Sequence, residues 1–301
     1  MLTLEDELAL REDLIDKVIS WANQGDGMLS REELGSVPYA GKTVRVIDQY
    51  GGIWNPSGSW GLGVQLQATL SINTTNSGKY DDQEITNGLW RYDYQTGSAE
   101  GKNAKLRAAL TLKLPLIWFV KQDSGRYVPY KVFIIEDVPD QNYFLISPDL
   151  SLAVAAKSES LIERKYAERM MKQRLHQPAF RARVINAYGI RCAICRLAHG
   201  SLLDAAHITP DSAENSSTSV SNGLCLCKIH HSAYDANIVG ISPEYIVQIR
   251  EDILNEVDGP MLQHGLKEMH GRELWVPNSQ EKQPDKVRLE SRFEQFLQTA
   301  S

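Results

Sequence analysis

The sequence predicts an α+β protein, in which helices join a β-rich domain to a smaller domain supported by a metal. Three observations predict this fold class. Apolar residues recur at helical spacing near the N-terminus, segments rich in β-branched and aromatic residues fill residues 38–148, and all four cysteines lie between positions 192 and 227. A length of 301 residues is enough for about two domains.

The composition argues against several classes of protein. Hydrophobic residues make up 42% of the chain, enough to build cores, and the formal net charge of −6 argues against a histone-like protein. A local basic stripe on an acidic protein can still bind DNA. No apolar run approaches the ~20 residues of a membrane span, and residues 1–16 carry acids where a signal peptide needs basic residues. We expect a soluble, cytoplasmic protein with no membrane partner.

Residues 1–36 are expected to form a helical N-terminal segment. Thr3 is followed three positions later by Asp6, and Ser30 by Glu33, which is the spacing of a helix capping box. After the first pair, apolar residues continue at helical spacing. One helix is therefore predicted over residues 3–24, and a second, short helix from Ser30.

Residues 37–150 are expected to form the β-rich domain. Its predicted strands are separated by Gly, Asn, Asp and Pro, and one helix is predicted over residues 103–111. The predicted strands are residues 43–47, 64–72, 89–94, 114–120, 130–136 and 143–146.

Residues 151–188 are expected to form a basic helical linker, and residues 189–301 a second domain that ends in a helix over residues 285–297. Two interpretations of the basic linker stay open: a solvated helix face, or a strip that contacts DNA phosphates. Its basic residues are Arg164, Lys165, Arg169, Lys172, Arg174, Arg181 and Arg183.

The cysteines predict a structural zinc site. Cys192 and Cys195 form one Cys-x-x-Cys turn, and Cys227 and His230 form a Cys-x-x-His turn about thirty residues later. Each turn directs two ligands at one ion, which suits tetrahedral Zn²⁺. Cys225 could replace His230 as a ligand, but the spacing from Cys225 to Cys227 is wrong for such a turn, so a small buried residue is expected there. The alternative is four packed free thiols.

Between these turns the pattern is a strand, a long loop, a second strand and a helix. His207 ends the first strand, Asn222 opens the second and His231 begins the helix. In order, spacing and flanking turns, these residues resemble the HNH nucleases of the ββα-metal class. The resemblance implies that His207 is a general base, that His231 binds a catalytic metal, and that Asn222 either holds the loop that carries His207 or touches the metal.

This chemistry explains the residue types. Phosphodiester hydrolysis needs a water deprotonated near neutral pH, which suits histidine, and a divalent ion such as Mg²⁺ or Mn²⁺ on the phosphate. Many HNH enzymes carry a metal ligand directly before the base, where this chain has Ala206. We therefore expect Asp204, two residues earlier on the same strand face, as the second metal ligand. Asp235 is a further ligand, an orienting group, or a residue with a helix-capping or core role. If neither aspartate contributes, the metal site is thin, and an inactive nuclease becomes the alternative.

A second resemblance concerns the β-rich domain. Residues 77–83 (SGKYDDQ) and 89–97 (LWRYDYQTG) resemble the SRA (YDG) domains, which have an SRA/PUA-like barrel and bind methylcytosine flipped out of the duplex. The resemblance implies stacking on Tyr80 and Tyr94 and a hydrogen bond to Asp82 or Asp81, with Gln83 where the family often has Asp. The alternative is that these tyrosines fill a β core.

Together the two resemblances imply a modification-dependent restriction endonuclease. Its partner would be double-stranded DNA carrying 5-methylcytosine or 5-hydroxymethylcytosine. One HNH site cuts one strand, so a homodimer is expected, with residues 1–24 and 285–297 as candidate dimer elements. The alternative is a modified-DNA reader whose HNH unit is structural and inactive, and Ala206 is the residue that favours it.

Overall fold

The structure is a computed structural model that describes residues 2–56, 62–74, 89–95, 101–122, 124–156, 158, 160–211, 213 and 215–300. It is a mixed α+β structure, as predicted, and divides into two compact units. Unit 1 comprises Met1–Ala22 and Gly27–Pro178, and unit 2 comprises Asn23–Asp26 and Ala179–Ser301. Within the described part of the chain, no helix combines the length and the apolar character of a membrane span.

Unit 1 begins with the two predicted helices, α1 (Leu4–Gln24) and α2 (Arg31–Leu34). The hydroxyl of Thr3 accepts a hydrogen bond from the Asp6 amide (3.1 Å) and donates to the Asp6 carboxylate (2.6 Å). Ser30 and Glu33 form a complete capping box before α2. The two capping patterns therefore mark the starts of both helices correctly.

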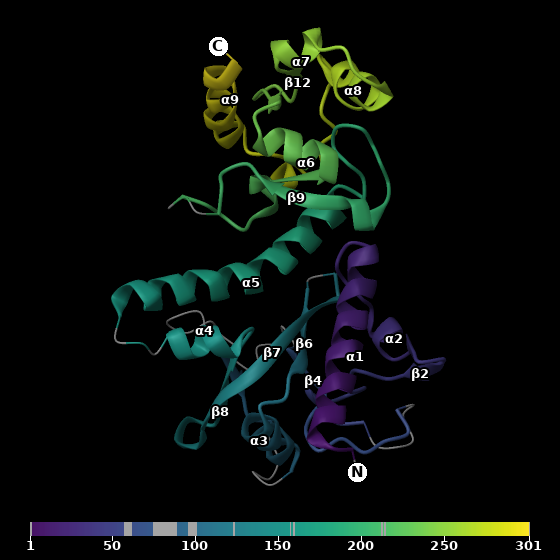
Figure 1. Ribbon diagram of the computed structural model, residues 1–301, viewed down its shortest axis with the longest axis vertical. Coiled ribbons are helices and arrows are strands. Elements are labelled where there is room, and N and C mark those ends of the chain that lie inside the picture. The colour runs from purple at the N-terminus through teal and green to yellow at the C-terminus, as the bar shows by residue number, and fades with distance from the viewer. Residues whose placement is uncertain are drawn as a thin grey trace. The chain divides into compact units, whose positions relative to one another are not determined.

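The centre of unit 1 is a six-stranded sheet in the order β3-β4-β6-β7-β8-β5 (Figure 1). β4 and β6 run parallel and the other neighbours are antiparallel. α3 (Lys102–Leu112) packs against β7, and α4 (Leu150–Ala155) against β7 and β8. The strands are β3 (Ile53–Trp54), β4 (Ser71–Thr74), β5 (Trp90–Asp93), β6 (Leu116–Lys121), β7 (Tyr127–Val138) and β8 (Tyr143–Ser147), with β1 (Val37–Tyr39) and β2 (Lys42–Val44) as a separate pair.

The expected closed barrel is not found in the part of this domain that the structure describes. Among the described residues the sheet is open, with β3 and β5 at its two edges. Residues 75–88, which include part of the SRA-like sequence, lie outside the described residues. The structure thus supports a β-rich unit in this part of the chain, and the SRA likeness stays a prediction.

A fully buried ion pair explains why the strand predicted from residue 64 begins only at Ser71. Arg11 and Glu7 on α1 pair at 2.8 Å with both side chains completely buried. The Arg11 guanidinium donates to the carbonyls of Ala68 and Thr69, and the Glu7 carboxylate accepts from the amide of Gln67. Because these side chains satisfy the Gln67 amide and the Ala68 and Thr69 carbonyls, these three backbone groups do not need a strand neighbour.

α1 is part of the core of unit 1. Leu14, Ile15 and Val18 are completely buried and belong to one cluster with Ile117 and Phe119 of β6. Exposed apolar residues on α1 are confined to its first turns, at Leu4 and Leu8. The apolar face of this helix is therefore used within the unit, and the expected role of residues 1–24 in a dimer stays a prediction.

Unit 2 is built around the antiparallel pair β9 (Leu203–His207) and β10 (Gly223–Cys227), followed by α6 (Lys228–Asp235). A second pair, β11 (Val239–Ile241) and β12 (Val247–Ile249), precedes α7 (Glu251–Asn255) and α8 (Pro260–Gly265). The predicted terminal helix is α9 (Lys286–Ala300), and its Leu289 and Phe296 are buried. Its apolar face therefore also packs within its own unit.

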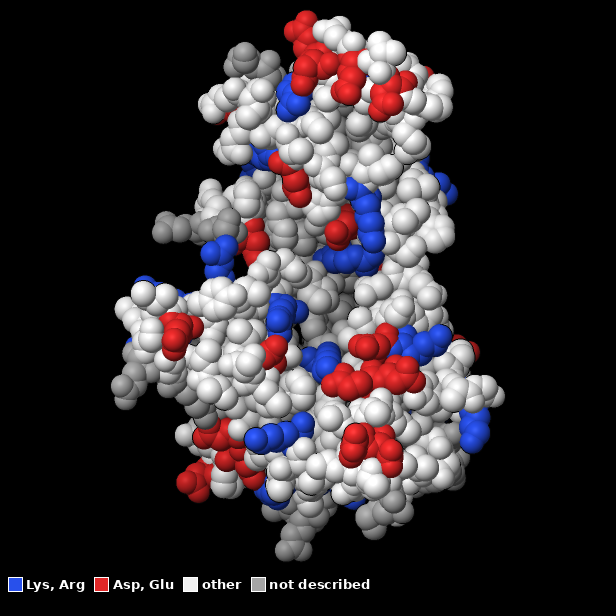
Figure 2. Space-filling view, viewed as in Figure 1, with Lys and Arg blue, Asp and Glu red and all other residues white. Residues whose placement is uncertain are grey.

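The basic residues predicted for the linker lie on α5 (Leu161–Ala187), in which Pro178 marks the division between the units. On the face shown in Figure 2, basic and acidic residues are intermixed rather than gathered by sign. Several α5 cations pair within the protein: Lys172 with Glu168, and Arg174 with Asp149. Arg164, Lys165 and Arg169 are exposed, and their contact with DNA phosphates stays a prediction.

The Glu7–Arg11 pair generates a prediction about stability. Arg11→Met leaves the Glu7 carboxylate buried without its partner, so unit 1 should lose about 3–5 kcal/mol of unfolding free energy. Lys131→Met is the matched control, because it breaks the partly exposed pair of Lys131 with Glu12 on the same helix and should cost about 0–1 kcal/mol. Denaturant unfolding followed by circular dichroism measures both; equal losses would contradict the role given to the buried pair.

Candidate functional site

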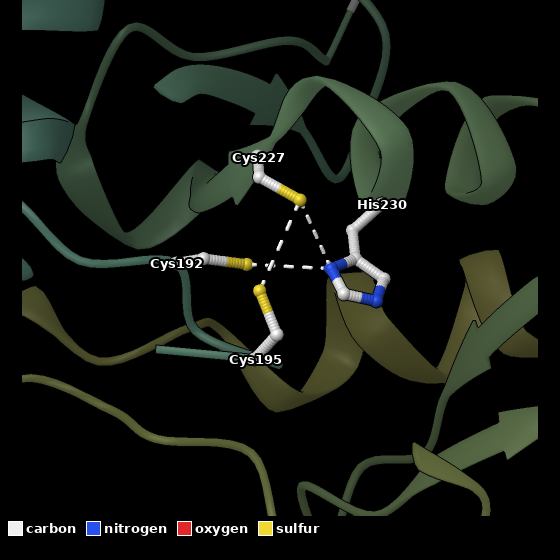
Figure 3. A group of neighbouring side chains, drawn as sticks. All are labelled: Cys192, Cys195, Cys227 and His230. Carbon is white, nitrogen blue, oxygen red and sulfur yellow. Dashed lines mark hydrogen bonds between the residues drawn. The ribbon is translucent and has the colours of Figure 1, made fainter. Parts of the chain in front are cut away.

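Three cysteines and one histidine converge in unit 2. Cys192 and Cys195 lie in the turn after α5, Cys227 directly precedes α6, and His230 lies in its first turn. Their ligand atoms all lie within 4.8 Å of one another and point to a common centre (Figure 3). The Nδ1 atom of His230 is 3.1 Å from the Cys227 sulfur and 3.5 Å from the Cys192 sulfur. Tetrahedral zinc with bonds of roughly 2.0–2.3 Å requires similar spacing, so the four residues fit this ion.

The surroundings of His230 favour metal binding through Nδ1. Its other ring nitrogen, Nε2, lies 2.7 Å from the carbonyl of Gly265 at the end of α8. This carbonyl favours the proton on Nε2, which leaves Nδ1 as the ligand. Burial alone would lower the pKa of His230, but contact with the Cys192 and Cys227 sulfurs outweighs it and raises the pKa to about 10. Binding of a metal cation at neutral pH would therefore release a proton from this cluster.

Cys225 stands outside the group of four. It is completely buried in the apolar core of unit 2, and burial raises the pKa of its thiol to about 12. A thiol with so high a pKa remains protonated and unreactive at neutral pH. The structure thus places His230, rather than Cys225, with the other three cysteines.

The signature residues lie on a strand–loop–strand–helix unit. In the register of β9 and β10, His207 at the end of β9 lies opposite Gly223 at the start of β10. Asn222 immediately precedes Gly223, and His231 lies in the first turn of α6. The predicted order of elements is confirmed, and it brings the end of one strand and the start of the other to the same place.

Asn222 holds the loop that follows His207. Its side chain is completely buried, accepts from the amide of Thr209 (2.8 Å), and donates to the carbonyls of Thr209 (3.1 Å) and Ser217 (2.8 Å). All its polar atoms are used in these bonds. Of the two roles left open for Asn222, the geometry favours holding the loop.

His207 is half-buried and stacks on Phe180 of α5, with ring centroids 4.0 Å apart and planes 12° apart. Gly223 makes this contact possible, because a Cβ there would lie 2.8 Å from the Phe180 ring. Burial lowers the pKa of His207; Asp211, Asp204 and Asp235 oppose this effect, and His231 adds to it. His207 is therefore neutral near pH 7, as a general base must be.

His231 lies between two carboxylates. Its Nδ1 is 3.3 Å from Asp204 Oδ2, and its Nε2 is 3.4 Å from Asp235 Oδ2. The contact with Asp204 raises the pKa of His231 and lowers that of the carboxyl group, although burial raises the latter. Because the two aspartates face opposite ring nitrogens, one can share a cation with His231 while the other orients the ring. The spacing of Asp204 and His231 suits two neighbouring oxygen and nitrogen ligands of a divalent cation.

Residues 192–242 match a family model described as HNH endonuclease. This HNH segment contains the Cys₃His group, β9, β10 and α6, together with His207, Asn222 and His231. It supports a nuclease function for unit 2. No curated protein sequence matches the chain.

Two solved structures resemble the chain at low identity. The first, titled modification dependent TagI restriction endonuclease, is 17% identical, with 90% of this chain and 92% of that chain covered and a TM-score of 0.34. The second, titled Type IV phosphorothioation-dependent restriction endonuclease ScoMcrA, is 13% identical, with 69% and 51% covered and a TM-score of 0.27. The chain spans about half the length of the second. Both TM-scores are too low to indicate a shared fold or function.

The structure shows that residues outside the HNH segment contact it, in roles that the sequence did not predict. Arg181, counted among the linker cations, is half-buried and donates to the carbonyls of Gly200 (3.1 Å) and Leu203 (3.0 Å). Its Nε lies 3.7 Å from Asp204 Oδ1, so it fixes the start of β9 and faces the carboxylate. Gly223, directly after Asn222, is the one feature of the sequence that relates to the close contact with Phe180, because a side chain at this position would meet the Phe180 ring. No sequence pattern indicates the carbonyl of Gly265.

Of the residues expected to bind a modified base, the structure describes only Tyr94. Tyr80, Asp81, Asp82 and Gln83 lie outside the described residues. Tyr94 is described: its hydroxyl donates to Asp137 and accepts from Arg107, and its ring packs 4.8 Å from Phe144. The hydroxyl of Tyr94 is thus engaged within unit 1, and its stacking on a base stays a prediction.

The metal group generates a prediction about zinc content. Cys195→Ala removes one of four ligands, so the purified variant should lose its zinc, and unit 2 should become less stable because zinc binding contributes to folding. Cys225→Ala is the matched control and should retain one zinc per chain, as the unmodified protein does. Elemental analysis by mass spectrometry measures both. Zinc loss on changing Cys225 with retention on changing Cys195 would reverse the assignment.

Proposed function

We propose that the chain is a metal-dependent DNA endonuclease that cleaves near modified cytosines. The observation that carries the nuclease half is that a half-buried His207, whose pKa is lowered by burial, shares one strand–loop–strand–helix unit with the Asp204–His231 pair, and both members of that pair act on its pKa. The match of residues 192–242 to the HNH endonuclease family supports the same chemistry.

In this mechanism His207 accepts the proton of the attacking water at its free ring nitrogen. Phe180 fixes the plane of the imidazole, and Asn222 fixes the backbone just beyond it. Asp204 and His231 would hold Mg²⁺ or Mn²⁺, with Asp235 orienting His231 from its other side. When bound, this ion supplies the positive charge that stabilises the phosphate and the leaving oxygen. Cys192, Cys195, Cys227 and His230 would hold Zn²⁺, which would have a structural role.

The inactive alternative depends on Ala206. This residue is completely buried in the core of unit 2, so the position before the base offers no ligand. Asp204, by contrast, is 41% exposed and in contact with His231. The proposed metal site therefore depends on Asp204, and Asp204→Asn is expected to abolish metal-dependent cleavage.

The specificity half rests on the sequence alone. The motifs in residues 77–83 and 89–97 support a pocket in which Tyr80 and Tyr94 stack on a flipped base while Asp82 and Gln83 bind its edge. The preferred base would be 5-methylcytosine or 5-hydroxymethylcytosine. Cleavage of both strands of a duplex would need a homodimer or two binding events.

Plasmid cleavage tests both halves of the proposal. Matched unmethylated and cytosine-methylated plasmids are incubated with enzyme and Mg²⁺, Mn²⁺ or EDTA, and we expect cleavage of the methylated plasmid only, with metal only. His207→Ala should reduce the rate about 10²–10⁴-fold through loss of the base. His199→Ala is the control, because His199 is exposed and lies outside the proposed site. Equal cutting of both plasmids would remove the reader, and no cutting with any metal would favour the inactive alternative.

The pH profile tests the role of His207. Because burial lowers its pKa below the ordinary value of about 6.5, kcat/KM at saturating metal should fall only below that pH. Phe180→Leu removes the stacked ring and exposes the imidazole, so the acid limb should move upward toward pH ~6.5. A limb that does not move in this variant, or that already lies above pH ~6.5 in the unmodified protein, would contradict the assignment of His207 as base.

A further inference from the structure

The terminal helix α9 lies outside the HNH segment, yet two of its arginines bind that segment. Arg288 and Arg292 are four residues apart and therefore lie on the same face of the helix, one turn from each other. Each guanidinium binds a different part of the ββα unit. The proposed mechanism has not used either residue.

Arg288 binds the loop that joins β9 to β10. Its Nη1 donates to the Thr209 hydroxyl and to the Asn215 carbonyl, both at 2.9 Å. Thr209 lies two residues after His207 and is the residue whose backbone Asn222 also binds. Just before α9, the amide of Asp285 donates to the carbonyl of Ser221 at the far end of the same loop. The start of α9 thus fixes the loop between β9 and β10 at both of its ends, one of which directly follows His207.

Arg292 binds the end of α6. Its Nη2 donates to the Tyr234 carbonyl (2.6 Å), its Nη1 donates to the Asn237 side chain, and its guanidinium lies 4.8 Å over the Tyr234 ring. Carbonyl groups in the last turn of a helix have no partner within the helix, and an arginine can supply one. Tyr234 directly precedes Asp235 and is three residues after His231, so the contact fixes the helix that carries both.

The apolar face of α9 fixes the helix itself. Leu289, between the two arginines, is completely buried, and Phe296 is 3% exposed. Phe296 lies against Gly240 of β11, where a Cβ would be only 2.5 Å from its ring. The absence of a side chain at Gly240 allows this close contact. The contact fixes how closely α9, and with it the two arginines, packs on the strands and helix of the HNH segment.

We propose that α9 positions the HNH site: Arg288 fixes the loop after His207, Arg292 fixes the helix of His231 and Asp235, and one rigid helix thereby sets the distance between base and metal ligands. This inference rests on the proposed function. Arg288 and Arg292 are positioning residues, since each acts through the backbone or side chains of other residues.

Hydrogen exchange tests the contacts without requiring activity. Arg288→Met should accelerate exchange at the amides of Ile208 and Thr209, and Arg292→Met at those of Ala236 to Ile238, by about tenfold in each case and only locally. Arg272→Met is the control, because Arg272 is exposed and lies outside α9, and it should change neither region. Exchange rates equal to those of the control at both places would overturn the proposal.

Cleavage kinetics test the positioning role. Arg288→Met should reduce kcat about tenfold or more at an unchanged half-saturating metal concentration, because it displaces the base and leaves the metal ligands in place. Arg292→Met should raise the half-saturating Mn²⁺ concentration about tenfold and leave kcat at saturating Mn²⁺ within about twofold. Arg288→Lys and Arg292→Lys should each recover part of the loss.

The outcomes separate the two proposals. If Arg288→Met and Arg292→Met exchange faster locally but cleave DNA with the same kinetics as Arg272→Met, the positioning role is overturned. It is also overturned if their loss of activity equals the fraction of protein that is unfolded. If the unmodified protein cuts no DNA under any metal, the proposed function fails. The exchange rates at Ile208 and Ala236 then still decide whether α9 holds the two parts of the unit.

Discussion

The stacking of His207 on Phe180 is the contact on which the arrangement of unit 2 depends. It requires the end of α5 to lie directly on the β9–β10 pair, and a glycine opposite His207 is what allows that distance. A residue with a side chain at Gly223 would meet both Phe180 and Val184. Burial of the imidazole, its lowered pKa and its fixed plane all follow from this one close approach, and the proposed role of His207 as a base depends on them.

In unit 1 a helix is also fixed closely to a neighbouring segment, here by a buried ion pair instead of an apolar contact. Glu7 and Arg11 are taken out of water completely, which is costly unless every polar atom finds a partner. They find them in the irregular backbone before β4, so the helix and the sheet are joined by hydrogen bonds that neither element could make with itself. This pair specifies where α1 lies more exactly than its apolar stripe could, because a helix can slide along an apolar surface but not along fixed carbonyl groups.

Local patterns were predictable from the sequence, and distant contacts were not. The capping residues, the order of strand, loop, strand and helix, and the Cys₃His spacing depend on neighbours in the chain, and each was found in its predicted place. The strand expected from residue 64 begins late because side chains distant in sequence bind the backbone before it. Among the described residues the sheet is open rather than a closed barrel, and the path of a whole sheet is not encoded in any one segment. Arg181 illustrates the limit: a cation in a basic run is indistinguishable, by sequence, from one that binds two carbonyls beside Asp204.

His230 and His231 are consecutive, yet they belong to centres of opposite chemical character. The first faces three sulfurs, a soft ligand set that selects zinc, and the second faces carboxylates, a hard set that accepts magnesium or manganese. Imidazole and carboxylate also bind zinc more strongly than manganese, as first-row affinity orders require. In the proposed enzyme the hard centre would therefore rely on the scarcity of free zinc around the protein, and the sulfur centre one peptide bond away would fill first whenever zinc is limiting.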